Sequence, residues 1–458
     1  MNDTENINMQ PAEETTVRTA INTDEGKKKT SKTAAEPVNR PADPYIWGIF
    51  LILAMISLVI TYDASSREVS GANIYAPLMK QGSFLVAGTF IMLSMQRINY
   101  QRFIPFIPLF AIVTLGLLAY VQMFGEVING ARRNITLLGF SLQPAEMAKL
   151  GVILLIALIM SKNQMVKGVK NAGVIWSAIV VITFGVLIFK QGLTNTLLLM
   201  FTSAAMMLIS GVQWKKIGLL LLIFGTFCGI YFGISKIIGT DDDEAIDATE
   251  VRTEQVAEAS NGRASREGTW RNRILRHLDT VPLYKKELNA INQQEMFSRM
   301  AQANGGITGV GPGNSRECSR LPLAFSDYIY SIIVEDTGLI GGLVLIAIYL
   351  MLLARAGHIA QRCKRAFPAL MVIGMAVLIV MQALFHMAIN VGFFPVSGQP
   401  LPFISMGGTS ILIMSMAMGI MLSVSRTART VSDKSTDIKD ELNKLPDNMQ
   451  GENQGLIK

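Results

Sequence analysis

Residues 320–342 read RLPLAFSDYIYSIIVEDTGLIGG, and they combine an apolar run with three carboxylates. The apolar run continues over 328–353, which is long enough for a membrane helix. Asp327, Glu335 and Asp336 nevertheless lie at its start or within it. Because a carboxylate near the middle of a bilayer costs roughly 2.5–3.5 kcal/mol, we expect these side chains to face a polar cleft and not lipid.

The composition of the whole chain favours a membrane protein. Of its 458 residues, 50% are hydrophobic and 16% are charged, a balance typical of polytopic membrane proteins and not of soluble ones. Because a hydrocarbon core about 30 Å thick needs roughly 20 apolar residues per helix, we predict ten membrane helices. They lie near 45–64, 81–96, 103–124, 143–161, 174–190, 194–212, 217–238, 328–353, 369–392 and 405–425, and the second and fifth are short.

The predicted helices divide the chain into five parts. We expect a polar tail over 1–43, helices one to seven within 44–238, an extracytoplasmic loop over 239–327, helices eight to ten within 328–425, and a second tail over 426–458. The tails are too polar to bury a core of their own. The predicted fold class is therefore an all-α polytopic membrane protein with a large loop between helices seven and eight.

Basic residues predict the orientation in the membrane. Lysine and arginine near helix ends are retained in the cytoplasm, and here they occupy alternate short loops and both tails. We therefore expect both termini to be cytoplasmic. The net charge of +7 follows from this bias and from attraction to anionic membrane lipids, so it does not indicate a nucleic-acid partner.

Two polar clusters precede or begin helices at the expected outer surface. Arg133 precedes the fourth helix, and Glu146 and Lys149 lie inside it on one face. Either the pair neutralises itself and joins helices, or Arg133 and Lys149 bind an anionic group such as pyrophosphate. GGITGVGPGNS, at 305–315, either gathers backbone N–H groups around an anion or forms a plain turn.

Two further clusters interrupt membrane helices. Glu335 lies about two turns inside its helix, so it should face a cavity or a basic partner, whereas Asp327 is placed to cap the helix N-terminus. Residues 390–410 contain three prolines and four glycines. Broken backbone at membrane depth is tolerated where it is buried in protein or lines a cavity. This stretch is therefore either a structural re-entrant loop or part of a substrate cavity.

The expected outer loop contains one helical pattern near its end. Met296, Met300 and Ala303 recur at helical spacing, which predicts an amphipathic helix lying against the membrane face. The three histidines are scattered along the chain, so they mark no metal site. Of these, His386 is best explained as a hydrogen-bonded residue inside a membrane helix.

Together, the four clusters resemble the SEDS family (shape, elongation, division and sporulation), which includes FtsW and RodA, over about 45–426. GARRNI at 130–135 and QPAEMAK at 143–149 are similar to the family's G-x-x-R-W-I and Q-P-[AS]-E-x-x-K. SDYIYSIIVEDTG at 326–338 and PVSGQPLPFISMGGTS at 395–410 are similar to two further family motifs. The four motifs in this order are highly specific, although no single one would be.

The resemblance implies a peptidoglycan glycosyltransferase that polymerises lipid II at the outer face of the bacterial cytoplasmic membrane. It also implies a class B penicillin-binding protein, which is a transpeptidase, and divisome proteins as partners. The long tails and the GPGNS string look more like the cell-division member FtsW, which implies septal synthesis. The alternatives are a RodA-type elongation polymerase, a lipid II flippase from the transporter class, and a structural scaffold of the division machinery.

The resemblance also implies the site. Arg133 and Lys149 would bind the leaving pyrophosphate, and a divalent cation, magnesium or manganese, would be held by carboxylates and substrate phosphates. Counting back from Gln294 by the family spacing places the general base at Glu287, with Asp279 as its rival. The implied substrate-binding residues are Arg133, Gln143, Glu146, Lys149, Asp327, Glu335, Ser405, Gly407 and Gly408.

The sequence departs from the family pattern at several positions. Asn134 stands for the usual Trp, Met406 for Tyr, Thr409 for Ser and Asp336 for the second Glu of its motif. KQGLTNT at 190–196 replaces a Q-P-D-x-G-T box almost entirely. The outer loop aligns poorly, so the identity of the base stays open between its two carboxylates.

Overall fold

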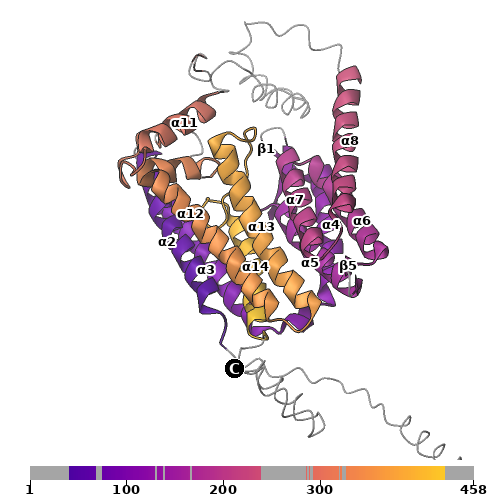
Figure 1. Ribbon diagram of the computed structural model, residues 1–458. Helices are drawn as coiled ribbons and strands as arrows, with labels where there is room; N and C mark the ends of the chain where they lie inside the picture. The colour runs from indigo at the N-terminus through magenta and orange to yellow at the C-terminus, as the bar shows by residue number, and fades with distance from the viewer. Residues whose placement is uncertain are drawn as a thin grey trace, which may run out of the picture. The chain divides into compact units, whose positions relative to one another are not determined.

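The structure is a computed structural model. It describes residues 41–68, 75–128, 131–137, 140–165, 168–238, 285, 288, 292–318, 320–321 and 326–428, all within one compact unit, residues 40–458. Eight helices in this part of the chain are long and apolar enough to cross a membrane (Figure 1). The ten expected stretches coincide with α2 (Pro44–Glu68), α3 (Tyr75–Arg97), α4 (Phe106–Phe124), α5 (Pro144–Lys162), α6 (Asn171–Phe189), α7 (Leu193–Ile209), α8 (Trp214–Ile238), α12 (Ile329–Gln361), α13 (Ala366–Val391) and α14 (Gly408–Ser425).

The predicted fold class is confirmed, and several boundaries move. Helices α3 and α6 have 23 and 19 residues, so neither is the short helix that we expected. The short one is α7, with 17 residues. Helix α12 runs on to Gln361, whereas α14 begins later than expected because 401–407 is not helical. Two shorter elements are the 3₁₀ helix η2 (Tyr100–Phe103) and α11 (Gln293–Gly305).

Two small antiparallel sheets connect helices, which the all-α prediction did not include. The larger has the order β1-β2-β3, and β4 pairs with β5 in the smaller. The segment before α5, between two predicted helices, is thus a β-meander. Its Ile-Thr-Leu run favours a strand, and Ile135 pairs with Leu142. The strands are β1 (Glu126–Ile128), β2 (Ala131–Leu137), β3 (Phe140–Leu142), β4 (Gln164–Met165) and β5 (Gly168–Val169).

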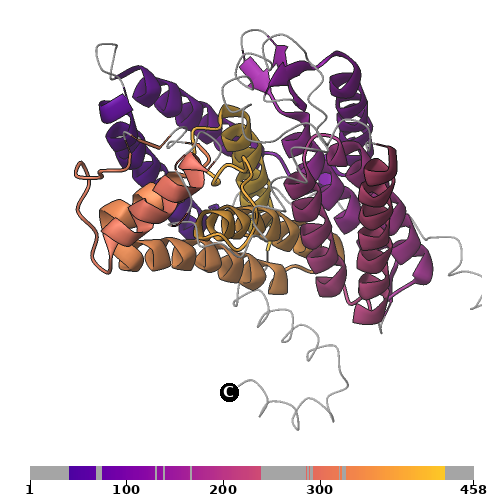
Figure 2. The ribbon, with the colours of Figure 1, turned by 90° about the horizontal axis from the view of Figure 1, so that it is seen from above.

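Helices α5 and α13 form the centre of the described bundle. In the most apolar stretch of each helix, 78% of the residues are buried inside the protein, against 22% for α3. Helix α13 packs on α5, α7, α12 and α14. Figure 2 shows α14, in yellow, between the indigo pair α2 and α3 and the magenta helices of residues 144–238. Polar side chains on α5 and α13 are therefore shielded from lipid by neighbouring helices.

Asp43, directly before α2, joins three helices at one end of the bundle. Its Oδ1 accepts the N–H groups of Tyr45 (2.9 Å) and Ile46 (3.4 Å), which caps α2. Its Oδ2 accepts Nε (2.8 Å) and Nη2 (2.5 Å) of Arg355 on α12. The N–H of Asp43 donates to Ser425 Oγ at the end of α14 (3.2 Å). The carboxylate therefore caps α2 and fixes α12 to it, and the backbone N–H of the same residue fixes α14.

We expect Asp43→Ala to lower the melting temperature of the purified protein in detergent more than Asp43→Asn does. The asparagine keeps an oxygen for the cap, which is worth about 1 kcal/mol, whereas alanine loses both the cap and the contacts with Arg355. Lys216→Ala, which removes an exposed hydrogen bond to Asn171, is the control and should change little. Equal melting temperatures for Asp43→Ala and the wild type would contradict the assignment.

Candidate functional site

Glu146 and Lys149 form a completely buried ion pair in the first turns of α5. Lys149 Nζ lies 2.7 Å from Glu146 Oε1, and both side chains are 0% exposed. Lys149 Nζ also donates to Gln382 Oε1 on α13 (2.8 Å). In the described part of the chain, Glu146 Oε2 accepts no hydrogen bond. The pair therefore has a bare carboxylate oxygen that a further polar group could approach.

The sequence explains why this pair begins α5. Pro144 occupies the first position of the helix, where its missing N–H costs nothing. The glutamate lies in the first turn, where its negative charge is stabilised by the helix dipole. Gln143 is the N-cap residue, but its side chain caps no N–H group, so substrate binding by Gln143 stays a prediction.

Arg133 lies on β2 and joins the meander to the turn between α6 and α7. Its Nε donates to the carbonyl oxygen of Gln191 (3.1 Å), and its side chain is partly buried. Gln191 belongs to KQGLTNT at 190–196, which stands where the SEDS pattern has a Q-P-D-x-G-T box. This segment therefore contacts Arg133. The described contacts of Arg133 and Lys149 are with different partners, and the joint anion site that we predicted for them stays a prediction.

Helix α12 breaks at Gly338, and the loop after α11 fills the break. Gly338 has φ +70°, a left-handed value that glycine adopts without strain. The N–H groups of 339–340 donate to the carbonyl oxygens of 306–307, at 3.0 and 3.3 Å. Those of 310–311 donate to the carbonyl oxygens of 335–336, at 3.0 and 2.9 Å. The loop thus satisfies backbone groups that the break would leave unpaired inside the protein.

Glycines permit this close approach of two backbones. A Cβ on Gly309 would collide with the carbonyl oxygen of Asp336, and a Cβ on Gly338 would collide with that of Ile307. The stretch 305–315 is therefore not a plain turn. The N–H groups of 310–311 bond to α12, so they are not available for an external anion.

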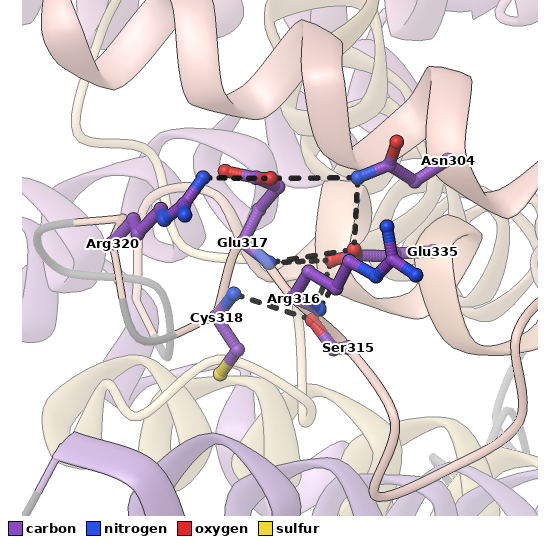
Figure 3. A network of polar contacts seen from close by, with 7 residues as sticks. All are labelled: Asn304, Ser315, Arg316, Glu317, Cys318, Arg320 and Glu335. Carbon is purple, nitrogen blue, oxygen red and sulfur yellow. Dashed lines mark hydrogen bonds and ion pairs between the residues drawn. The ribbon is translucent and has the colours of Figure 1, made fainter.

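Glu335 lies just before the break and is completely buried. Its carboxylate accepts hydrogen bonds from Ser315 Oγ, from the N–H groups of Arg316 (3.0 Å) and Glu317 (3.4 Å), and from Asn304 Nδ2 (3.4 Å). Figure 3 shows these donors converging on it. The N–H groups near the glycine-rich stretch thus do surround an anion, which is a carboxylate of the protein itself.

The contacts of Glu335 bear on the expectation for it. The carboxylate is shielded from lipid, as predicted, and Asp336 is also buried, at 1% exposure. Of the two alternatives, a cavity or a basic partner, the described residues supply no basic partner, and the contacts of the carboxylate are the four donors from 304–317. Charge-assisted hydrogen bonds of this kind contribute roughly 1.5–3 kcal/mol each. Glu335 therefore anchors the loop, and direct substrate binding by it stays a prediction.

Asp327 precedes α12 but does not cap it, so that prediction is wrong. The N-cap residue is Tyr328, and no side chain caps this helix. The carboxylate of Asp327 instead lies beside Gly398, where an added Cβ would be 3.1 Å from Oδ2. Its carbonyl oxygen accepts Asn390 Nδ2 (3.1 Å). Asp327 therefore connects the start of α12 to α13 and to the segment that follows α13.

The segment 393–407, between α13 and α14, is not helical, and it is exposed at its start and buried over 401–405. It follows Gly392, whose φ of +81° ends α13. Phe403 is fully buried with φ +65°, a conformation that costs a residue with a Cβ roughly 1–2 kcal/mol. Its ring packs edge-on against Phe50 at 5.4 Å. Surrounding protein thus holds this backbone in place, as the re-entrant-loop alternative requires.

Ser405 and Gly407 of this segment and Gly408, which begins α14, are the candidate residues here. Ser405 Oγ donates to the carbonyl oxygen of Ser326, just before α12 (2.7 Å). Gly408 lies under the ring of Phe84 on α3, so closely that a Cβ there would collide with the ring. Gly407 and Gly408 are both partly buried. Substrate binding by Ser405, Gly407 and Gly408 stays a prediction.

Helix α11 confirms the predicted helix, and its contact with the membrane stays a prediction. Met300 is 40% exposed, Ala303 is exposed and Met296 is only partly buried. The helix packs on α12 through its other face, where Ser298 Oγ hydrogen-bonds to Ser331 Oγ (2.7 Å). Small residues on that face let the backbones approach closely. The buried residues are Phe297, Ser298, Ala301 and Gly305.

Gln382 and Asn390 are site residues that the sequence analysis did not identify. Together with His386 they recur every four residues on α13, and all three are buried. His386 Nδ1 contacts the carbonyl oxygen of Gln399 at 2.6 Å, which confirms it as a hydrogen-bonded residue inside the protein. The four-residue spacing in an otherwise apolar helix is a signal that could have identified the other two.

Some predicted features lie outside the described residues. Asp279 and Glu287 are among them, so the identity of the base stays a prediction, as do the tails before residue 41 and after residue 428. Within the described ranges, no group of three or more His, Cys, Asp or Glu side chains could hold a metal ion. The described residues alone therefore do not form a site for the expected divalent cation.

An apolar groove of about 1000 Å³ lies between α2 and α3. Its lining residues, with one serine as an exception, carry apolar or aromatic side chains. Behind it, Gln81 Nε2 donates to Ser57 Oγ (2.7 Å) and to the carbonyl oxygen of Ile404 (3.3 Å). The two helices that form the groove thus also contact the 393–407 segment. Residues that line it include Leu58, Val59, Tyr62, Met79, Val86 and Phe90.

The sequence of this chain is similar to those of known proteins along most of its length. The model of the cell cycle protein family of FtsW, RodA and SpoVE matches residues 44–430. The peptidoglycan glycosyltransferase MrdB of Escherichia coli is 24% identical, over 86% of this chain and 95% of MrdB. The probable peptidoglycan glycosyltransferase FtsW of Geobacter metallireducens is 28% identical, over 81% of this chain and 92% of that protein.

Solved structures share the fold. A chain from a peptidoglycan synthase complex that coordinates polymerization and crosslinking superposes with a TM-score of 0.60 at 21% identity, covering 85% of this chain and 99% of that one. The rod shape determining protein RodA of Thermus thermophilus gives a TM-score of 0.58 at 18% identity, covering 85% of this chain and 98% of RodA.

We expect Glu335→Ala to release the 305–318 loop without unfolding the bundle. The substitution leaves the N–H groups of Arg316 and Glu317 without their acceptor, and Arg316 is already exposed. Trypsin should then cleave after Arg316 several-fold faster than in the wild type, measured by mass spectrometry of peptides from detergent-solubilised protein. Glu295→Ala, which removes a partly exposed pair with Arg299, is the control. Unchanged cleavage in Glu335→Ala would refute the anchoring role.

Proposed function

Because the chain belongs to the cell cycle protein family of FtsW, RodA and SpoVE, we propose that it is a peptidoglycan glycosyltransferase that polymerises lipid II. Relatives named for this activity match along 81–86% of the chain. The observation in the structure that supports the proposal best is the buried pair of Glu146 and Lys149, which occupies the position of the family's E-x-x-K motif. Charged groups are rarely retained inside a membrane bundle without a function.

The proposed reaction joins two sugars and releases a lipid pyrophosphate. A sugar hydroxyl of one lipid II attacks the anomeric carbon of the growing chain, so a new C–O bond forms and the bond to the pyrophosphate breaks. The hydroxyl proton passes to a carboxylate base, Glu287 or Asp279 in this proposal. The negative charge that develops on the leaving pyrophosphate is stabilised by Arg133 and Lys149. The divalent cation, held by carboxylates and substrate phosphates, stays a prediction, and no step is assigned to it.

Lipid II also carries an isoprenoid chain, which needs an apolar path beside the bundle. The groove between α2 and α3 has this character, and its helices contact the segment that holds Ser405 and Gly407, and Gly408 at the start of α14. We assign the meander, α11 and the 393–407 segment to the outer side of the membrane, with both termini in the cytoplasm. The basic residues in the opposite loops support this orientation.

The finer role that we propose is septal synthesis with a class B penicillin-binding protein as partner. The long tails and the GPGNS string favour the division type over the elongation type. A complex with a transpeptidase would resemble the solved synthase complex, which coordinates polymerization and crosslinking. Depletion of this protein in its own host distinguishes the roles, because loss of a septal polymerase gives filaments and loss of an elongation polymerase gives rounded cells.

We expect Lys149→Met to reduce glycan polymerisation from purified lipid II by at least about 100-fold, because a preorganised charge that stabilises a leaving group contributes of this order. The substitution also leaves Glu146 as an unpaired buried charge, which costs roughly 3–5 kcal/mol. The variant Glu146→Gln with Lys149→Met removes both charges, so it should recover stability and stay inactive. Full activity of this stable double variant would refute the role of the pair.

We expect one of Glu287→Gln and Asp279→Asn to lower polymerisation by about 10²–10⁴-fold, as loss of a general base does, and the other to have little effect. Gel analysis of glycan products from radiolabelled lipid II measures both. If both variants keep wild-type activity, neither carboxylate is the base. A transporter would instead move labelled lipid II across vesicle membranes and lengthen no glycan, an outcome that would overturn the polymerase proposal.

A further inference from the structure

Gln382 on α13 holds a central place between the ion pair of α5 and the 393–407 segment. Its Oε1 accepts Lys149 Nζ at 2.8 Å. Its Nε2 donates to the carbonyl oxygen of Pro400 (3.3 Å) and approaches Ser410 Oγ (3.4 Å). The side chain is 0% exposed. One amide group thus touches the lysine, the re-entrant segment and α14.

The two ends of this amide cannot be exchanged. The ammonium of Lys149 only donates hydrogen bonds, and the carbonyl oxygen of Pro400 only accepts them. A reversed amide would place its NH₂ group against the ammonium and its oxygen against the carbonyl oxygen. Both contacts would then be repulsive inside a buried site, where such groups interact strongly. The neighbours of Gln382 therefore fix which way its oxygen points.

The segment that orients Gln382 is itself held by the same face of α13. One turn further along, His386 Nδ1 contacts the carbonyl oxygen of Gln399, the residue before Pro400. After another turn, Asn390 Oδ1 accepts Ser331 Oγ of α12 at 3.0 Å. His386 thus fixes the segment beside Pro400, the acceptor of Gln382, and Asn390 joins the same face of α13 to α12.

Lys149 depends on Gln382 because Glu146 alone does not define its direction. Glu146 lies three residues earlier on the same helix, so that contact moves with α5 and leaves the long, flexible lysine side chain several rotamers. The contact with Gln382 comes from a different helix and restrains the far end of the side chain. Two acceptors on two helices give Nζ one position, and its remaining N–H one direction.

We propose that Gln382 is a positioning residue for the glycosyl transfer and holds Lys149 Nζ where it meets the leaving pyrophosphate. This inference rests on the proposed function, since it gives the lysine its role in that reaction. It adds a residue that acts through Lys149, on a helix to which the sequence analysis assigned no site residue. Because a misplacement of about 1 Å can cost up to 10²-fold in rate, loss of Gln382 should lower kcat more than it raises KM.

A double-mutant cycle tests this dependence. Gln382→Met keeps the size of the side chain and removes both hydrogen-bonding ends, and we expect it to lower the polymerisation rate about tenfold. In a Lys149→Met background the same substitution should cost less than about twofold, because coupled residues are not additive. Lys149→Arg serves as a second background in which a cation remains and turnover is measurable. The tenfold factor should shrink there too, since the guanidinium does not reproduce the position of Nζ.

The control separates a positioning role from a structural one. Thr202→Val also removes a buried hydrogen bond, from Thr202 Oγ1 to the carbonyl oxygen of Leu198 in its own helix (2.8 Å), and it should leave the rate unchanged in every background. If Gln382→Met still lowers the polymerisation rate tenfold in both lysine backgrounds, the inference is overturned. A wild-type rate for Gln382→Met alone would overturn it too. Absence of polymerisation by the wild-type protein would instead refute the proposed function, so the two failures are distinguishable.

Discussion

A bilayer offers no water to backbone or side-chain polar groups, so each such group inside the bundle must find its partner in the protein. The break in α12 shows the consequence for the backbone. Its freed N–H and carbonyl groups pair with residues 306–311, and glycines make the close approach possible. The same constraint organises the side chains of α13, whose three buried polar residues bind the 393–407 segment, the start of α12 and Lys149.

The helices could be predicted from the sequence because apolar length is a local property that each segment carries by itself. The β-meander could not, since its strands are short and only their mutual pairing distinguishes them from a loop. The face of α11 that packs on α12 was not predicted, for a physical reason. Methionine is more apolar than Ala301 or Gly305, but close packing on α12 selects small residues, and it leaves Met300 outside.

The candidate site was predictable in part for a similar reason. Glu146 and Lys149 are neighbours on one helix, so their spacing alone predicts that they meet. The acceptor that Gln382 offers to the lysine lies on another helix, more than two hundred residues away, and no local pattern in one sequence reveals such a pair. Glu335 was correctly expected to avoid lipid, but two of its four donors are backbone N–H groups, and a sequence does not show where those point.

The break in α12 also bears on how deep in the membrane the acidic residues lie. Residues 339–361, after Gly338, form a helix that at roughly 1.5 Å per residue is by itself long enough to span the hydrocarbon core. In the orientation proposed above, the turns before the break would extend beyond the span toward the outer headgroup zone. Glu335 and Asp336 would then belong to this outer layer. Their burial would cost less there than at mid-bilayer, because the break in the helix would lie at the boundary of the hydrocarbon core.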